Sequence, residues 1–172
     1  MQLTKVSEEL HKFAKYVIQQ ARTELSKGKK NSSKKLYNSL DYRINEYSDS
    51  IDLLFNMEDY GAYQDLGVSG VKKKYNTVYS FKDKMPPPSS LDKWIVRRGL
   101  KDVRDEKGRF VPRKSLQYMI ARSIYRDGIK PSFFFTKPFQ AAFERLPDEI
   151  SEAFAFSIMQ DEKFFPENMN KN

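Results

Sequence analysis

The chain has 172 residues, enough for one conventional hydrophobic core, and contains no cysteine and a single histidine. Disulfide bonds and thiolate metal sites are therefore excluded, and we expect neither a structural metal nor a cofactor. The net charge of +8 is unevenly distributed, with about +1 in residues 1–60, +11 in residues 61–140 and −4 in residues 141–172, which is typical of nucleic-acid binding or of self-association between unlike surfaces.

The N-terminal segment has the periodicity of a long amphipathic helix. Its apolar side chains recur every three or four residues, at Leu3, Val6, Leu10, Phe13, Ala14, Val17, Ala21 and Leu25, and Gly28 is placed to end it. The segment lacks the apolar stretch of a signal peptide, and no part of the chain approaches the ~20 apolar residues that span a bilayer. We expect a protein that is made in a cytoplasm and has no membrane partner.

Two segments with alternating apolar residues predict a β-hairpin. Residues 36–47 place Leu36, Leu40, Tyr42 and Ile44 on one face of a strand, and residues 51–57 place Ile51, Leu53, Phe55 and Met57 on one face of the next, with turn residues Ser48–Ser50 between them. The following segment, DYGAYQDLGVSG at residues 59–70, contains three glycines and predicts a sharp backbone turn.

The middle of the chain is basic and partly helical. Residues 71–85 are predicted as a strand or a long loop, and helices are predicted at residues 91–98 and 114–126, with Gly128 as the cap of the second. We interpret residues 71–127 as an insertion into a single domain of residues 1–160, followed by a C-terminal tail or arm at residues 161–172.

The densest apolar run is GIKPSFFFTKPF at residues 128–139, where prolines bound three phenylalanines. In an extended segment Phe133 and Phe135 would share one face while Phe134 takes the other. Two interpretations are open, since all three side chains could belong to the core, or one face of the segment could contact a neighbouring subunit.

Helical spacing resumes after this run. Thr136 and Pro138 predict a helix start, and Pro147 predicts either a kink or two consecutive helices.

The chain contains few residues that are suited to catalysis. His11 has no partner that the helical periodicity places beside it, which indicates a structural or solvated histidine. Asp59 and Asp65 flank the glycine-rich segment, where a divalent cation is conceivable, but turn formation explains aspartate at such positions. The glycines lack the spacing of a phosphate-binding loop. We therefore predict no catalytic, cofactor-binding or metal-binding residues, and a protein that is not an enzyme.

The basic residues Lys72, Lys73, Lys74, Arg97 and Arg98 could neutralise nucleic-acid phosphates, or could form a solvated face. No helix-turn-helix, zinc-finger or RNP-like pattern organises them. A basic nucleic-acid-binding accessory protein is the alternative to the interpretation that follows.

Two short motifs stand far apart in the sequence. Tyr60, Tyr63, Asp65 and Gly67 match a "Tyr-Ala-x-Tyr-x-acid-x-Gly" pattern, and Pro131, Phe133, Phe134, Pro138 and Ala141 loosely match a "Pro-x-Pro-Phe-hydrophobic-x-Pro-Ala" pattern. Their order behind a long N-terminal helix and a strand entry LYNSL at residues 36–40 resembles the head-to-tail joining, or tail-completion, proteins of tailed bacteriophages. The segment 72–127 is longer than is typical of that family.

We predict an α+β fold, with a small, mainly antiparallel sheet packed by the long N-terminal helix and a C-terminal helix, and with a basic, partly helical insertion. The resemblance implies a structural virion protein: a homo-oligomeric, ring-forming neck subunit that contacts other neck, portal-side or tail proteins and lets DNA pass through its lumen. Such a protein would be assembled in the host cytoplasm and located in the virion neck or tail. The residues expected at protein interfaces are Tyr60, Tyr63, Asp65, Lys72, Lys73, Lys74, Phe133, Phe134 and Phe135.

Overall fold

The computed structural model describes residues 4–28, 33–47 and 50–160, so the predicted tail at residues 161–172 and part of the predicted hairpin turn lie outside the described residues. The fold is α+β, as predicted: seven α-helices and one two-stranded antiparallel sheet are present in these ranges. The elements are α1 (Thr4–Lys27), α2 (Lys35–Ser39), β1 (Asp41–Glu46), β2 (Ile51–Asn56), α3 (Tyr60–Leu66), η1 (Pro88–Leu91), α4 (Asp92–Arg97), η2 (Leu100–Asp102), α5 (Arg113–Asp127), α6 (Thr136–Phe143) and α7 (Leu146–Gln160).

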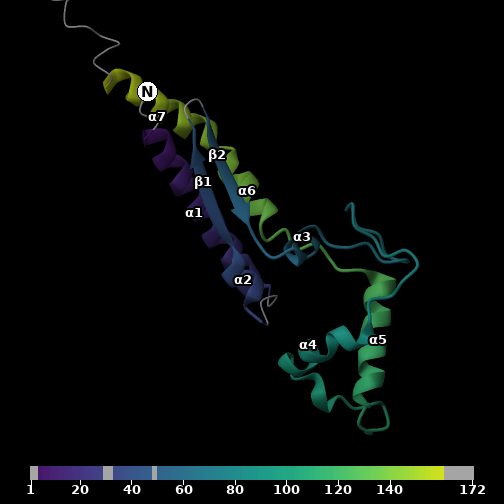
Figure 1. The fold of residues 1–172 in the computed structure, drawn as a ribbon. Coiled ribbons are helices and arrows are strands. Elements are labelled where there is room, and N and C mark those ends of the chain that lie inside the picture. The colour runs from purple at the N-terminus through teal and green to yellow at the C-terminus, as the bar shows by residue number, and fades with distance from the viewer. Residues whose placement is uncertain (1–3, 29–32, 48–49, 161–172) are drawn as a thin grey trace, which may run out of the picture.

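One elongated body is formed by α1, α2, the hairpin, α6 and α7, which run side by side in Figure 1. The apolar face of α1 is the centre of its core, as its periodicity predicts, and packs on both strands and on α6 and α7. The strands pair in register, with Tyr42 opposite Phe55 and Ile44 opposite Leu53. Leu53 and Phe55 pack on the core while Leu54 between them is exposed, so the predicted alternation of β2 is confirmed.

The first predicted strand begins later than its pattern indicated, because residues 35–39 form the short helix α2. Leu36 and Leu40 are four residues apart, a spacing that buries both on one face of a helix as well as of a strand. The Arg22 guanidinium donates to the carbonyl oxygens of Tyr37 (3.2 Å) and Leu40 (2.9 Å), and so satisfies acceptors at the end of the helix. This contact comes from α1, so the local pattern does not contain it.

The glycine-rich segment 59–70 was predicted as a turn, but its first part is helix α3. Gly61 lies inside the helix, where a Cβ would be 2.5 Å from the sulfur of Met57; the glycine therefore permits close packing and does not bend the chain. The bend itself is at Gly67, which has φ of 76°. Of the three glycines in this segment, Gly67 alone has the positive φ of the predicted turn.

The basic lobe, which we define as residues 71–127, lies outside the body (Figure 1). The loop at residues 71–85 contains no helix or strand, and α4 and α5 follow, close to their predicted positions. The lobe has few buried apolar side chains, among them Ile95, Leu116 and Ala121. Asp92 fixes α4 to α5 because it accepts from Arg113 (2.6 Å) and Gln117 (2.6 Å).

The two chain segments that enter and leave the basic lobe are paired with each other. Val68 and Ile129 exchange both backbone hydrogen bonds, at 2.8 and 2.7 Å. Beside them Gly70 and Gly128 approach so closely that a Cβ on either would lie 2.5 Å from the backbone nitrogen of the other. Gly128 also ends α5 with φ of 76°, so its predicted capping role is confirmed.

Pro147 lies at the second position of α7, and α6 ends at Phe143, so this region consists of two consecutive helices. None of the helices in the described ranges is both long and apolar enough to cross a bilayer.

Candidate functional site

The two motifs that are far apart in the sequence meet at Asp65. Its side chain is only 4% exposed, and its Oδ1 accepts from the backbone N–H groups of Phe135 (2.8 Å) and Thr136 (3.3 Å). Its Oδ2 accepts from the Thr136 hydroxyl, and its backbone carbonyl accepts from Ser132 and Phe133 (both 3.0 Å). Asp65 of α3 is therefore the cap of α6, a role that the sequence indicated for Thr136.

The three phenylalanines do not lie in an extended segment, the conformation for which their alternation was predicted. Phe133 has φ of 52°, and residues 134–135 turn directly into α6. Phe134 is 1% exposed and belongs to the cluster around Leu25 and Leu40, whereas Phe133 and Phe135 are half-buried. The alternation argument was wrong because hydrogen bonds to Asp65 bend this segment, and those bonds depend on a residue about 70 positions away.

Phe135 has a core role of its own. Its ring contacts Phe55 (centroids 5.3 Å) and Phe139 (5.9 Å) and bridges the two core clusters of the body. Phe133 is in neither cluster, and Lys137 lies over its ring at 5.7 Å. Of the three, Phe134 is unavailable to a neighbouring molecule, and Phe133 is the one with no described place in the core.

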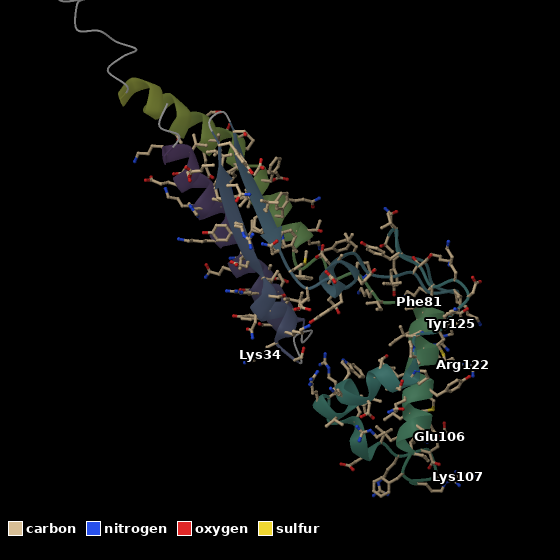
Figure 2. All side chains as sticks on the ribbon, viewed as in Figure 1. Lys34, Phe81, Glu106, Lys107, Arg122 and Tyr125 are labelled. Carbon is tan, nitrogen blue, oxygen red and sulfur yellow. The ribbon has the colours of Figure 1, made fainter. Side chains whose placement is uncertain are left out.

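An apolar groove of about 610 Å³ lies between α3 and the loop of the basic lobe. It is lined by Tyr60, Tyr63, Gln64, Val68, Val78, Tyr79, Ser80, Phe81, Lys82 and Ile129. Tyr63 packs edge-on against Tyr79 (centroids 4.5 Å) but remains 45% exposed, and Val78 is 85% exposed. Figure 2 shows Phe81 beside Tyr125 of α5, with which it makes a ring contact at 6.2 Å. The predicted residues Tyr60 and Tyr63 thus lie on a real apolar surface.

The loop wall of the groove, residues 78–82, was not predicted from the sequence. Ser69 positions it: its N–H donates to Tyr79 (2.9 Å), and its carbonyl accepts from Phe81 (2.8 Å). Tyr75, Thr77, Tyr79 and Phe81 alternate within residues 71–85, the segment predicted as a strand or a long loop. Ser69, with which this segment pairs, lies in the glycine-rich segment, and no local sequence pattern indicates the pairing.

The positive charge of the protein is concentrated in the basic lobe. Residues 71–127 contain 16 basic and 6 acidic side chains, net +10, whereas the rest of the chain contains 15 and 17, net −2. The exposed Asp148, Glu149 and Glu152 lie on α7, at the opposite end of the molecule (Figure 1). The two ends therefore have complementary charge.

Lys72, Lys73 and Lys74 are exposed at the junction of the basic lobe with the body. The backbone N–H groups of Lys72 and Lys73 donate to the Arg126 carbonyl (2.9 and 3.3 Å), while the Lys74 ammonium donates to Gly70 (2.8 Å). Hydrogen bonds from the Arg126 side chain, with a smaller contribution from the charge of Lys73, lower the pKa of Asp127. The loop that carries these lysines is thus fixed to the end of α5.

Arg97 and Arg98 are exposed on and just after α4, separate from the lysine run. The Arg98 guanidinium lies over the Trp94 ring (5.6 Å), and Arg104 lies over the exposed ring of Phe110 (3.9 Å). The structure therefore does not combine the five predicted nucleic-acid contacts into one patch; it places aromatic rings beside arginines at the far part of the lobe.

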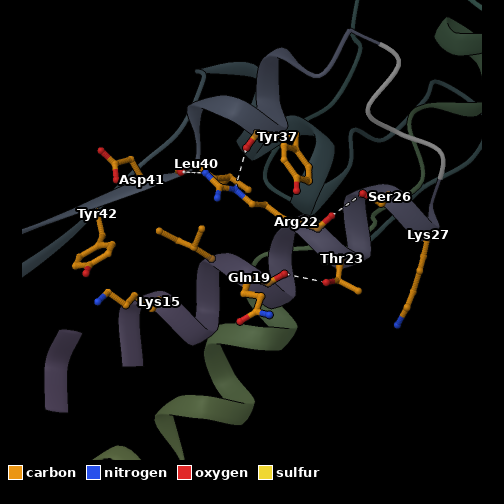
Figure 3. A pocket seen from close by; sticks show the side chains of 11 residues that line it. Lys15, Gln19, Arg22, Thr23, Ser26, Lys27, Tyr37, Leu40, Asp41 and Tyr42 are labelled. Carbon is orange, nitrogen blue, oxygen red and sulfur yellow. Dashed lines mark hydrogen bonds between the residues drawn. The ribbon is translucent and has the colours of Figure 1, made fainter. Parts of the chain in front are cut away.

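A second, more polar groove of about 690 Å³ lies between α1 and the start of the hairpin (Figure 3). In this groove the Arg22 side chain already donates a hydrogen bond to the Leu40 carbonyl at the end of α2. Lys15, Lys27 and Asp41 are the other charged residues that line the groove. Nearby, His11 Nδ1 is 2.9 Å from the Tyr42 hydroxyl, a pairing across elements that helical periodicity could not indicate. No group of three metal-ligating side chains occurs in the part of the chain that the structure describes.

Comparison with known proteins finds no matching family model, no matching curated protein and no matching solved structure.

Proposed function

We propose that the protein is a structural virion protein of a tailed bacteriophage, a ring-forming neck or tail-completion subunit that joins head and tail. The observation that carries this proposal is that the two motifs that resemble those of tail-completion proteins are in contact at Asp65. Its carboxylate and carbonyl accept hydrogen bonds from four of the five residues 132–136, all except Phe134. Motifs matched by chance would have no reason to form one hydrogen-bonded unit.

Charge supports self-association of a head-to-tail kind. A closed ring requires each copy to present two different surfaces, one to each neighbour. The basic lobe, with net charge +10, and the acidic α7 supply such a pair on opposite ends of one molecule. Complementary charges of this sort steer association and fix the relative orientation of the copies.

In this proposal the ring is assembled in the host cytoplasm and is located in the neck or tail of the virion. Its partners are further copies and portal-side or tail proteins, and DNA passes through its lumen. The protein acts by binding and sealing, and no step of catalysis is assigned to it.

The first prediction concerns the oligomeric state. We expect the purified chain, alone or with a portal-side or tail protein, to form a closed ring of uniform copy number. Native mass measurement gives the number of copies, and negative-stain electron microscopy shows whether they close. A chain that is monomeric both alone and with each of these partners would contradict the proposal.

The observation that supports the alternative, a nucleic-acid-binding accessory protein, is the presence of exposed aromatic rings beside arginines in the basic lobe. One variant separates the two functions. Reversing Lys72 and Lys73 to glutamate should weaken self-association at least about tenfold, because these side chains lie exposed beside the groove loop, while duplex DNA binding stays weak and unchanged.

Sedimentation and an electrophoretic shift at low salt measure the two effects. The matched control reverses two exposed lysines of α1, Lys15 and Lys27, which should leave self-association nearly unchanged. Tight duplex binding by the unaltered chain, lost with rising salt and lost in the first variant, would favour the alternative.

A further inference from the structure

We propose that the apolar groove between α3 and the loop at residues 78–82 binds the C-terminal segment, residues 161–172, of a neighbouring copy. The inference rests on the proposed self-association and names the surfaces that meet. It concerns the groove lined by Tyr60, Tyr63, Val78, Tyr79 and Phe81, described above.

The groove has the chemistry of a peptide-binding surface. Its aromatic walls are half-exposed, and its volume of about 610 Å³ lies within the ~300–1,000 Å³ typical of ligand pockets. Ser80 lies on the loop wall between Tyr79 and Phe81, whose backbone groups both hydrogen-bond to Ser69. Among the described residues, nothing pairs with the backbone N–H and C=O of Ser80. An extended segment can therefore add to this edge by main-chain pairing while its side chains fill the aromatic groove.

The sequence of residues 161–172, DEKFFPENMNKN, fits such a groove. Phe164 and Phe165 are adjacent apolar rings, and Pro166 disfavours continuation of the helix that precedes them. Phenylalanine rings pack well edge-on against the tyrosines that line the groove. Asp161 and Glu162 precede them and can approach Lys82 at the rim. The segment therefore offers both the apolar and the charged half of the contact.

The geometry favours binding of the C-terminal segment from a neighbouring copy over binding of the segment from the same copy. Helices α6 and α7 begin beside α3, where Asp65 caps Thr136, and end at Gln160 at the far end of the body (Figure 1). At 1.5 Å per residue these 25 positions extend about 37 Å. Twelve further residues reach at most about 41 Å even when fully extended, so a return to the same copy's groove would leave almost no slack. A neighbouring copy is under no such restriction.

Photocross-linking in the full chain tests this contact. Tyr63 is replaced by p-benzoylphenylalanine, and ¹⁴N- and ¹⁵N-labelled chains are mixed before irradiation so that mass spectrometry distinguishes cross-links between copies from those within one copy. We expect position 63 to cross-link to residues 161–172 of another copy. The Phe164→Ala, Phe165→Ala variant should lower the yield at least about tenfold. The matched control places the same probe at Tyr118, which is 51% exposed on α5 and does not line the groove.

Cross-links confined to one copy, or directed elsewhere in the chain, would overturn the inference; if rings still form, the proposed function stands without it. Cross-links to residues 161–172 of another copy in open chains or dimers would support the inference and count against the ring. If the full chain is monomeric, a synthetic peptide of residues 159–172 is added in excess, and failure to cross-link to position 63 overturns the inference.

Discussion

Replacing Asp65 by alanine should lower the free energy of unfolding by about 3 kcal/mol or more, because the substitution removes a buried acceptor of three hydrogen bonds. The N–H groups of Phe135 and Thr136 would lose their acceptor at the start of α6, where an unsatisfied donor is costly. The carboxylate also lies at the positive end of the helix dipole. Urea unfolding followed by circular dichroism measures the change, provided that the dependence on denaturant concentration stays the same.

Two controls identify the cause. Asp65→Asn retains an acceptor but removes the charge, and should lose about half as much stability. Asp59→Ala removes an exposed aspartate that precedes α3 and makes no capping hydrogen bond with its side chain, so its effect should be within about 0.5 kcal/mol. Equal stability of Asp65→Ala and Asp59→Ala would show that the two motifs are not held together at Asp65.

The Asp65 junction also marks the limit of prediction from the sequence. The long helix α1 and the alternation of β2 could be predicted because each pattern is local and buries one face. Leu36 and Leu40 were assigned to a strand because a separation of four residues satisfies both periods. The contact that selects the helix, from Arg22, belongs to tertiary structure.

The candidate site could be predicted from the sequence only in part. Tyr60 and Tyr63 were identified from their motif, and both are exposed on the groove. Asp65 and Phe134 were expected at interfaces with the same motifs, but burial inside the chain gives them structural roles. A motif indicates that residues matter and does not separate those that support a surface from those that form it. The loop wall around Tyr79 depended on pairing with Ser69, for which the sequence contains no local pattern.

Replacing Gly128 by alanine should lower the free energy of unfolding by about 3 kcal/mol or more. Its φ of 76° is unfavourable for alanine, and the new Cβ would overlap the Val68 carbonyl oxygen and lie 2.5 Å from the Gly70 nitrogen. These atoms belong to the paired segments that connect the body to the basic lobe, and backbone atoms cannot move aside as a flexible side chain can. Denaturant unfolding measures the loss, and hydrogen exchange locates it at residues 68–70 and 126–129.

Gly108→Ala is the matched control, since Gly108 has nearly the same φ, 75°, but a Cβ there would meet nothing within 4 Å. It should cost only the backbone strain, about 1 kcal/mol. The difference between the two variants therefore measures the close approach alone, and equal effects would show that the paired segments tolerate separation. Because this pairing also positions the loop wall of the groove through Ser69, Gly128→Ala should reduce cross-linking from position 63, whereas Gly108→Ala should not. The body and the basic lobe would then be linked in function as well as in structure, with one glycine pair fixing the surface on which assembly is proposed to depend.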